Sequence, residues 1–215
     1  MYNKVLTGIL IILITSILGI AAYVGYGYYK KYTLNKDAKE YLEEFDTMFV
    51  DISNKQQEQP PTDDTQNNQT NTGMGGIVTD KLVYKGFKVI GKLEMPTINI
   101  QYPILDVITH AKAIEVSIGM LYGAGINQVG NTVIIGHNYN NGLFFGKNKY
   151  LKVGDKIYIT DLNGNRMEYT IFNKYATPES DTSYITRTTD GKIEVTLVTC
   201  DATGDNRIVV CARVE

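Results

Sequence analysis

The sequence has few of the side chains that staple a protein, ligate a metal or bind nucleic acid. Its 215 residues include only two cysteines, Cys200 and Cys211, and two histidines, His110 and His137. Two cysteines are too few for a secreted scaffold built on disulfides, and these four residues lack the spacing of zinc ligands. The formal net charge of −2 gives no basic footprint for nucleic acid. We therefore expect no disulfide framework, no metal or cofactor, and no nucleic-acid partner.

One long segment contains no charge at all. Residues 5–29 are uncharged and are bounded by Lys4 on one side and by Lys30 and Lys31 on the other. About 20 such residues cross a bilayer as a helix, whereas a cleaved signal peptide has a shorter apolar core and an Ala-x-Ala-like site. We predict an uncleaved, single-pass transmembrane anchor over residues 1–31. The flanking lysines do not decide its orientation.

Three further regions follow the anchor. Residues 32–53 carry apolar side chains at helical spacing between acidic ones, which predicts an amphipathic juxtamembrane helix that packs on the domain or on the membrane surface, or alternatively binds a partner. Residues 54–76 are rich in Gln, Asn, Thr, Pro and Gly and are predicted to be a disordered polar linker. Residues 77–215 are then one domain, long enough for a single core.

The domain has the pattern of a mainly β protein. Candidate strands, separated by turn signals, are expected at residues 88–95, 99–103, 131–136, 156–161, 166–175, 192–199 and 207–214. A short helix is expected at Ala111–Ser117 and a single helical turn near Phe144–Lys147. Many short strands with little helix predict a closed or sandwich-like antiparallel sheet.

Three reactive side chains lie at the ends of predicted strands. Cys200 ends the run KIEVTLVTC, His137 lies near the end of NTVIIGHN, and Arg207 begins the last strand. A thiolate is a strong nucleophile, an imidazole moves protons near neutral pH, and a guanidinium can hold a developing oxyanion. Together they have the chemistry to attack a carbonyl group through sulfur. Competing residues are His110 for proton transfer and Arg187 or Arg213 for the cation.

The two cysteines are too far apart to be joined if the last two strands form a hairpin. Arg207 would then lie roughly opposite Cys200, and Cys211 would lie about 13 Å further along the strand. A disulfide needs Cα atoms within about 7 Å, so we predict two free thiols, with Cys211 an apolar residue of the sheet. In the same hairpin, Arg207 could instead form only a surface ion pair with Asp201 or Asp205.

The joint order of these segments closely resembles that of the sortases, the cysteine transpeptidases that attach proteins to the Gram-positive cell wall. The matching segments are VIGKLEMPTINIQYPIL (Val89–Leu105), GNTVIIGHN (Gly130–Asn138), YLKVGDKIYITDLNGNRMEYTI (Tyr150–Ile171), and TLVTC followed by Arg207. The family fold is a closed eight-stranded β-barrel, and the predicted strands agree with it. The resemblance therefore implies such a barrel, with one or two short helices, behind the N-terminal transmembrane helix.

The resemblance also implies roles for individual residues. Cys200 would be the nucleophile, His137 the general acid and base, and Arg207 the third catalytic residue. The substrates would be surface proteins that bear an LPXTG-like sorting signal and an amine of a lipid II-like cell-wall precursor. The catalytic domain would be extracellular, held at the cell membrane through residues 5–29. Thr199 is expected to orient the substrate or shape the oxyanion site, the alternative being a plain strand residue. Ile135 and Leu197 are expected to bind the substrate as part of the groove wall, the alternative being the barrel core.

The subclass stays open among classes A, B and D. A second C-terminal hydrophobic segment and an Asp-Pro-aromatic lid, both typical of class C, are not seen. Some class A members bind Ca²⁺, but acidic loop residues are more often solvated, and we expect no metal at Glu179, Asp181 and Asp190. The alternative functions are a peptidoglycan-directed cysteine hydrolase or L,D-transpeptidase, and a non-catalytic anchored binding module.

Overall fold

The computed structural model describes residues 2–57 and 82–215, which fall into two compact units, residues 1–37 and 38–215. The described residues of the first unit, 2–37, lie within a single helix, α1 (Tyr2–Gln57). Between Lys4 and Met48 this helix has a stretch with a mean hydropathy of 2.6 and none of it buried. By length and composition it can cross a membrane, so the predicted N-terminal apolar helix is present and is a candidate membrane anchor.

The second unit contains the strands that follow α1. The strands are β1 (Val83–Tyr84), β2 (Phe87–Met95), β3 (Ile100–Asp106), β4 (Ile118–Tyr122), β5 (Gly130–Ile135), β6 (Lys156–Thr160), β7 (Arg166–Pro178), β8 (Ile193–Cys200) and β9 (Asn206–Arg213). Three short 3-10 helices interrupt them: η2 (Pro96–Ile98), η3 (Ala111–Glu115) and η4 (Asn148–Tyr150).

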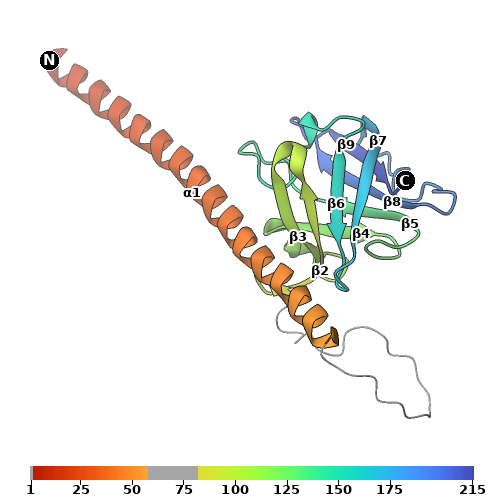
Figure 1. The fold of residues 1–215 in the computed structure, drawn as a ribbon. Coiled ribbons are helices and arrows are strands. Elements are labelled where there is room, and N and C mark those ends of the chain that lie inside the picture. The colour runs from red at the N-terminus through yellow and green to blue at the C-terminus, as the bar shows by residue number, and fades with distance from the viewer. Residues whose placement is uncertain (1, 58–81) are drawn as a thin grey trace, which may run out of the picture. The chain divides into compact units, whose positions relative to one another are not determined.

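Eight of these strands close into a barrel (Figure 1). Hydrogen bonds join them in the order β2-β3-β4-β5-β8-β9-β7-β6, and β6 pairs again with β2. The two-residue β1 pairs with β2 as an appendage. Closure removes the unpaired edges of the sheet. The closed eight-stranded barrel implied by the sortase resemblance is therefore confirmed.

The sheet is mixed, which corrects the expectation of an antiparallel one. β3 pairs with β4 in parallel, and β5 pairs with β8 in parallel. Parallel neighbours need a crossover connection; η3 lies in the first crossover, and β6 and β7 lie in the second. β4 was not predicted, because its sequence IGMLY is short and carries no turn signal at its start. The predicted helical turn near Phe144–Lys147 forms slightly later, at η4.

The strand that carries Cys200 is buried along nearly its whole length. Residues Glu194–Thr199 of β8 are all buried. Residues of the β7–β8 connection cover this part of the barrel, where Tyr184 and Ile185 pack with Val198, Val209 and neighbouring apolar side chains. A strand packed in this way leaves little freedom to the residue at its end. The fold thus holds Cys200 on a rigid support.

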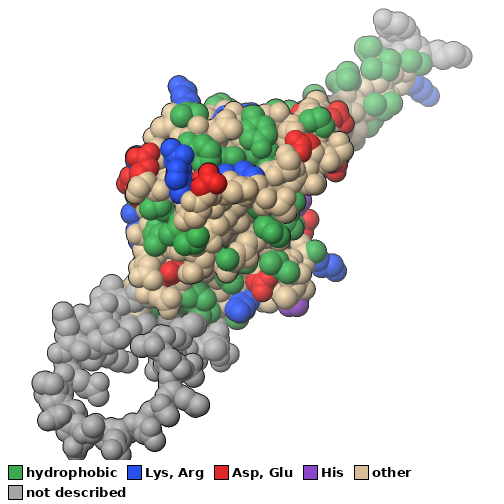
Figure 2. Space-filling view, turned by 90° about the vertical axis from the view of Figure 1, so that its right-hand side faces the viewer, with side chains coloured by type: hydrophobic (Ala, Val, Ile, Leu, Met, Phe, Trp, Pro, Cys, Tyr) green, Lys and Arg blue, Asp and Glu red, His purple; other side chains and the backbone are tan. Residues whose placement is uncertain are grey.

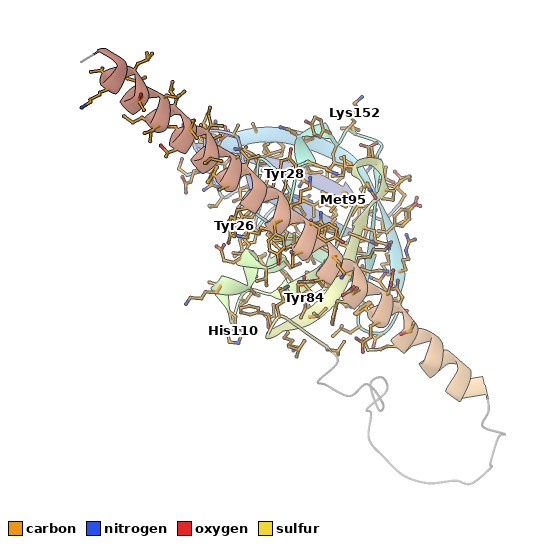
Figure 3. The ribbon with its side chains drawn as sticks, turned by 90° about the vertical axis from the view of Figure 1, so that its left-hand side faces the viewer. Tyr26, Tyr28, Tyr84, Met95, His110 and Lys152 are labelled. Atoms are coloured by element: carbon orange, nitrogen blue, oxygen red, sulfur yellow. The ribbon has the colours of Figure 1, made fainter. Side chains whose placement is uncertain are left out.

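Within the second unit, the end of α1 packs against the barrel. Ala38, Leu42, Phe45 and Met48 recur at helical spacing and are buried. The ring of Tyr41 lies 5.3 Å from that of Tyr84 on β1, and Figure 3 shows Tyr84 beside the helix. Residues 38–48 of α1 are therefore docked on the barrel.

A buried lysine also ties this segment to the sheet. The Nζ atom of Lys92 on β2 lies 2.6 Å from Oδ1 of Asp46, and the Lys92 side chain is only 7% exposed. Glu94 adds a second carboxylate at 3.8 Å. The helix extends through Gln57, so the first residues of the predicted 54–76 linker are helical. Residues 58–81, which include the rest of that linker and the start of the predicted 77–215 domain, lie outside the described residues.

Candidate active site

Cys200 and Arg207 lie at the same end of the β8–β9 hairpin. Cys200 is the last residue of β8, Arg207 is the second residue of β9, and the register pairs them directly. Cys200 is partly exposed. The sequence prediction that Arg207 lies opposite Cys200 is confirmed, and the hairpin brings a thiol and a guanidinium to one open end of the sheet.

The loop between them is organised by Asp201. Its Oδ1 atom accepts hydrogen bonds from the backbone N–H groups of Thr203 and Gly204 at 3.0 and 2.7 Å, and its Oδ2 atom accepts one from the Asn206 amide at 2.8 Å. These donors, the Asn206 side chain first, lower the pKa of Asp201 to about 2. Asp201 therefore shapes the turn between the two site residues.

Arg207 forms its ion pair with Glu179. The alternative expected from the sequence was a surface ion pair with Asp201 or Asp205. The Nη2 atom of Arg207 lies 2.6 Å from Oε1 of Glu179, which follows β7. Its Nη1 atom donates to the Gly204 carbonyl at 3.0 Å. Because the guanidinium is planar, contacts through two of its nitrogens fix its orientation. Arg207 is thus an oriented cation at the open end of the hairpin.

His137 is tied to the end of β8 through the residues on each side of it. The Gly136 carbonyl accepts a hydrogen bond from the Thr199 hydroxyl at 2.6 Å, and the Asn138 amide donates to the Cys200 carbonyl at 2.8 Å. These bonds extend the parallel β5–β8 pairing beyond β5. His137 therefore lies between two residues that are bonded to Thr199 and Cys200, so the three predicted catalytic residues converge on one end of the barrel.

The His137 ring has an acidic partner that sequence reasoning missed. Its Nε2 atom lies 3.1 Å from Oε1 of Glu115, the last residue of η3. The Tyr139 ring lies 5.2 Å from the imidazole, and its hydroxyl donates to Oε2 of Glu115 at 3.4 Å. Nothing in the sequence links Glu115 to His137, because their proximity arises from the β3–β4 crossover.

The residues expected to contact substrate differ in accessibility. Ile135 is partly exposed, Thr199 is 3% exposed with its hydroxyl bonded to Gly136, and Leu197 is fully buried. Leu197 therefore belongs to the barrel interior and has no surface for a peptide. Thr199 can act on the site by joining the strand of His137 to that of Cys200.

The competing residues lie in other settings. His110 is exposed at the start of η3, with its ring 6.2 Å from that of Phe87, and it lies at the periphery of the domain in Figure 3. Arg187 forms an ion pair with Glu194. The Cζ atom of Arg213 lies 5.0 Å from the centre of the Phe172 ring. None of these contacts joins them to Cys200.

Cys211 lies further along the same hairpin, opposite Thr196. Both cysteines are free thiols, as predicted, and Cys211 is buried, which raises its pKa.

Over residues 2–57 and 82–215, no cluster of three or more His, Cys, Asp or Glu side chains could hold a metal ion. On the face drawn in Figure 2, acidic and basic side chains are interspersed with apolar ones.

Comparisons with known proteins agree with this architecture. The family model described as "Sortase domain" matches residues 93–215. Over 200 residues the chain is 31% identical to sortase A of Bacillus anthracis, an alignment that covers 88% of this chain and 82% of that protein.

Solved sortases have the same fold. A sortase D5 transpeptidase of Clostridium perfringens matches with a TM-score of 0.58 and 25% identity, over 84% of this chain and 99% of that one. Sortase A from Corynebacterium diphtheriae matches with a TM-score of 0.52 and 29% identity, over 60% of this chain and 62% of that one.

Proposed function

This chain belongs to the sortase family, and we propose that it is a membrane-anchored cysteine transpeptidase with Cys200 as its nucleophile. The observation that carries the proposal is the pairing of Cys200 with Arg207 across β8 and β9, with His137 tied to the same strand end. Nucleophile, proton carrier and cation are the parts that acyl transfer through sulfur requires.

In the first half-reaction, the Cys200 thiolate attacks the carbonyl carbon between Thr and Gly of an LPXTG-like sorting signal. A C–S bond forms and the carbonyl oxygen takes up the electron pair as an oxyanion. When the carbonyl re-forms, the C–N bond breaks and the leaving amine takes a proton from His137. The products are a thioester on Cys200 and a free amino group on the departing peptide.

In the second half-reaction, an amine of a cell-wall precursor attacks the thioester carbonyl. His137, now neutral, accepts the proton that this amine loses. The C–S bond then breaks, an amide is formed and Cys200 is released as the thiolate. Proton and electron pair both return to their starting positions, so the enzyme is ready for another turnover.

Arg207 has the remaining role. The guanidinium is always charged and can contact two oxygens at once, so it suits both the peptide backbone of the donor and the oxyanion of each tetrahedral intermediate. Its bonds to Glu179 and Gly204 support this role by holding the fork at the open end of the hairpin. Ile135, partly exposed beside this end, is the proposed apolar contact for the donor peptide.

We further propose that the catalytic domain works on the outer side of the cell membrane, held there by residues 5–29. The donors would be surface proteins with a sorting signal, and the acceptor a lipid II-like amine. The apolar first unit supports membrane attachment, and the family supports this substrate class.

The test is acyl transfer by the full chain in detergent. The enzyme is incubated with a panel of sorting peptides, alone or with candidate amines, and the products are read by mass spectrometry. We expect cleavage after Thr and, with an amine present, a product in which the amine replaces the leaving peptide. Cleavage of muropeptides instead would identify a peptidoglycan-directed enzyme, and failure to act on either with Cys200 unmodified would indicate a binding module.

A further inference from the structure

We propose that Glu115 is a positioning residue for His137: its carboxylate holds the imidazole at Nε2 and so leaves Nδ1 to exchange the proton in transpeptidation. This inference rests on the proposed function, since it assigns a partner to the general acid and base of that reaction. The contact itself joins Nε2 of His137 to Oε1 of Glu115 at 3.1 Å.

The backbone that carries Glu115 is firmly seated. Two residues later, the buried Ser117 hydroxyl donates to the Pro103 carbonyl at 2.6 Å. β4 then begins at Ile118 and pairs with both β3 and β5. A Cβ atom on Gly136 would come within 2.9 Å of the Ile118 side chain, so this segment packs directly on the residue before His137. The Glu115 and His137 backbones are therefore held together by the barrel.

Both oxygens of the Glu115 carboxylate contact side chains of the loop that carries His137 and Tyr139. While Oε1 meets His137, Oε2 accepts the Tyr139 hydroxyl at 3.4 Å. The Tyr139 ring lies 5.7 Å from that of the buried Phe144, which supports it from behind. Burial first, and Glu115 next, raise the pKa of Tyr139, so its hydroxyl stays protonated and remains a donor. One carboxylate thus spans an imidazole and a phenol and limits rotation of both rings.

The chemistry of a carboxylate then selects the working nitrogen. An ionised carboxylate only accepts hydrogen bonds, so Nε2 must carry a hydrogen while the contact lasts. In the neutral ring the lone pair is then on Nδ1, and this nitrogen takes the proton from the incoming amine. In the protonated ring Nδ1 carries the proton that the leaving amine receives. Glu115 sets the orientation and tautomer of His137 without touching the substrate.

The kinetic test compares Glu115→Ala, Glu115→Gln and Lys112→Ala with the wild-type full chain in the peptide–amine assay. Loss of orientation should lower kcat by about tenfold in Glu115→Ala and leave KM nearly unchanged, because misplaced catalytic groups slow chemistry more than binding. Glu115→Gln keeps an acceptor oxygen, so its kcat should lie between that of Glu115→Ala and that of the wild type. Lys112 is exposed on the same helix η3, so Lys112→Ala should behave as wild type.

Chemical rescue separates positioning from a general structural role. Glu115 is 59% exposed, so formate or acetate can reach the space left in Glu115→Ala and should restore part of kcat. The same salts should leave Lys112→Ala unchanged. A normal kcat for Glu115→Ala would overturn the inference. So would a low kcat in Glu115→Ala that neither formate nor acetate raises, together with an equally low kcat in Glu115→Gln.

A measurement that needs no activity tests the contact directly. The chain has only two histidines, so selective ¹⁵N labelling gives two imidazoles, and His110→Asn assigns them. In Glu115→Ala the ring nitrogens of His137 should shift while those of His110 do not. Unchanged His137 signals would contradict the contact even if the wild type proves inactive. An inactive wild type with shifted signals would instead overturn the proposed function and leave the contact standing.

Discussion

The open end of the β8–β9 hairpin and its interior are built for opposite purposes. At the open end, the partly exposed Cys200 pairs with Arg207 beside a polar loop. Further along the same two strands, Thr196 pairs with Cys211, and both are buried. Two thiols on adjacent strands thus differ in access to water and in the groups around them.

The buried part of the hairpin around Thr196 and Cys211, called here the interior end, is held by a polar network. The Thr196 hydroxyl donates to Oδ1 of Asn131 at 2.7 Å, and the Asn131 amide donates to the Tyr184 and Ile185 carbonyls at 2.9 and 3.1 Å. Satisfied buried networks of this kind make a structure rigid. The same hairpin is thus held rigid at one end and exposes its reactive groups at the other.

Removal of each thiol in turn should give the largest difference between the two ends of the hairpin. Without Cys200 no thioester can form, so Cys200→Ala should lower kcat by about 10⁴-fold or more. Cys211→Ala should keep most of the rate and cost about 1 kcal/mol of stability from lost burial. Steady-state kinetics and thermal melting measure both. A folded but inactive Cys211→Ala would remove the distinction between the two ends.

The second contrast is between the arginines at the two ends of β9. Loss of a group that stabilises an oxyanion costs about 10²–10³-fold in kcat, so Arg207→Ala should be slow but folded. Arg207→Lys should also be slow, because an ammonium group cannot reproduce the planar fork. Arg213, which lies over Phe172, provides the control, and Arg213→Ala should be nearly normal. Wild-type rates for Arg207→Ala would leave only Cys200 and His137 as the chemical pair.

Substitutions at the interior end should lower the free energy of unfolding and leave kcat nearly unchanged. Arg187 forms an ion pair with Glu194, whose side chain is only 5% exposed. Removing one partner of a buried pair leaves a charge without compensation, so Arg187→Ala should cost about 3 kcal/mol. The control is Arg166→Ala, whose pair with Glu94 is more exposed and should contribute about 0–1 kcal/mol. Denaturant unfolding gives both values, and a large fall in kcat for folded Arg187→Ala would extend the active site to this end.

The smallest expected effect concerns pH at the open end. Hydrogen bonds from Asn206 and from the loop lower the pKa of Asp201 to about 2. A carboxyl group whose folded pKa is lowered stabilises the fold above its ordinary pKa of about 4, and this contribution is lost as the pH falls from about 4 to about 2. The protection factors of the Thr203 and Gly204 amides, which correct for the intrinsic exchange rate, should therefore fall in this range. Asp201→Asn should show no such transition; a transition of the same size there would assign it to another group.

Sequence patterns predicted that Cys200 and Arg207 lie opposite each other, because both residues lie at the ends of adjacent strands. Cys200 and Arg207 flank a short polar loop, so a hairpin register follows from their spacing alone. His137 follows the end of another strand, β5, by two residues, and the order of these segments resembles one family. Thr199 was also expected to act at the site, through the substrate. In the structure its buried hydroxyl instead donates a hydrogen bond to the Gly136 carbonyl.

What the sequence could not predict depends on contacts between distant segments. Glu115 reaches His137, and Glu179 reaches Arg207, only after the crossovers of the barrel have formed. In the same way, the helical spacing of residues 38–52 predicted an apolar face, but not that Asp46 contacts Lys92 on β2. Such pairs leave no periodicity, since neither partner is near the other in the chain.

Identification of the thiol that carries the acyl group tests the role of Cys200 directly. The full chain is mixed with a sorting peptide in the absence of an amine, quenched in acid, digested and mapped by tandem mass spectrometry. We expect an acyl adduct on the peptide containing Cys200, removable by hydroxylamine, and none on the peptide containing Cys211. An adduct on Cys211, or cleavage of the sorting peptide by Cys200→Ala, would contradict the role of Cys200.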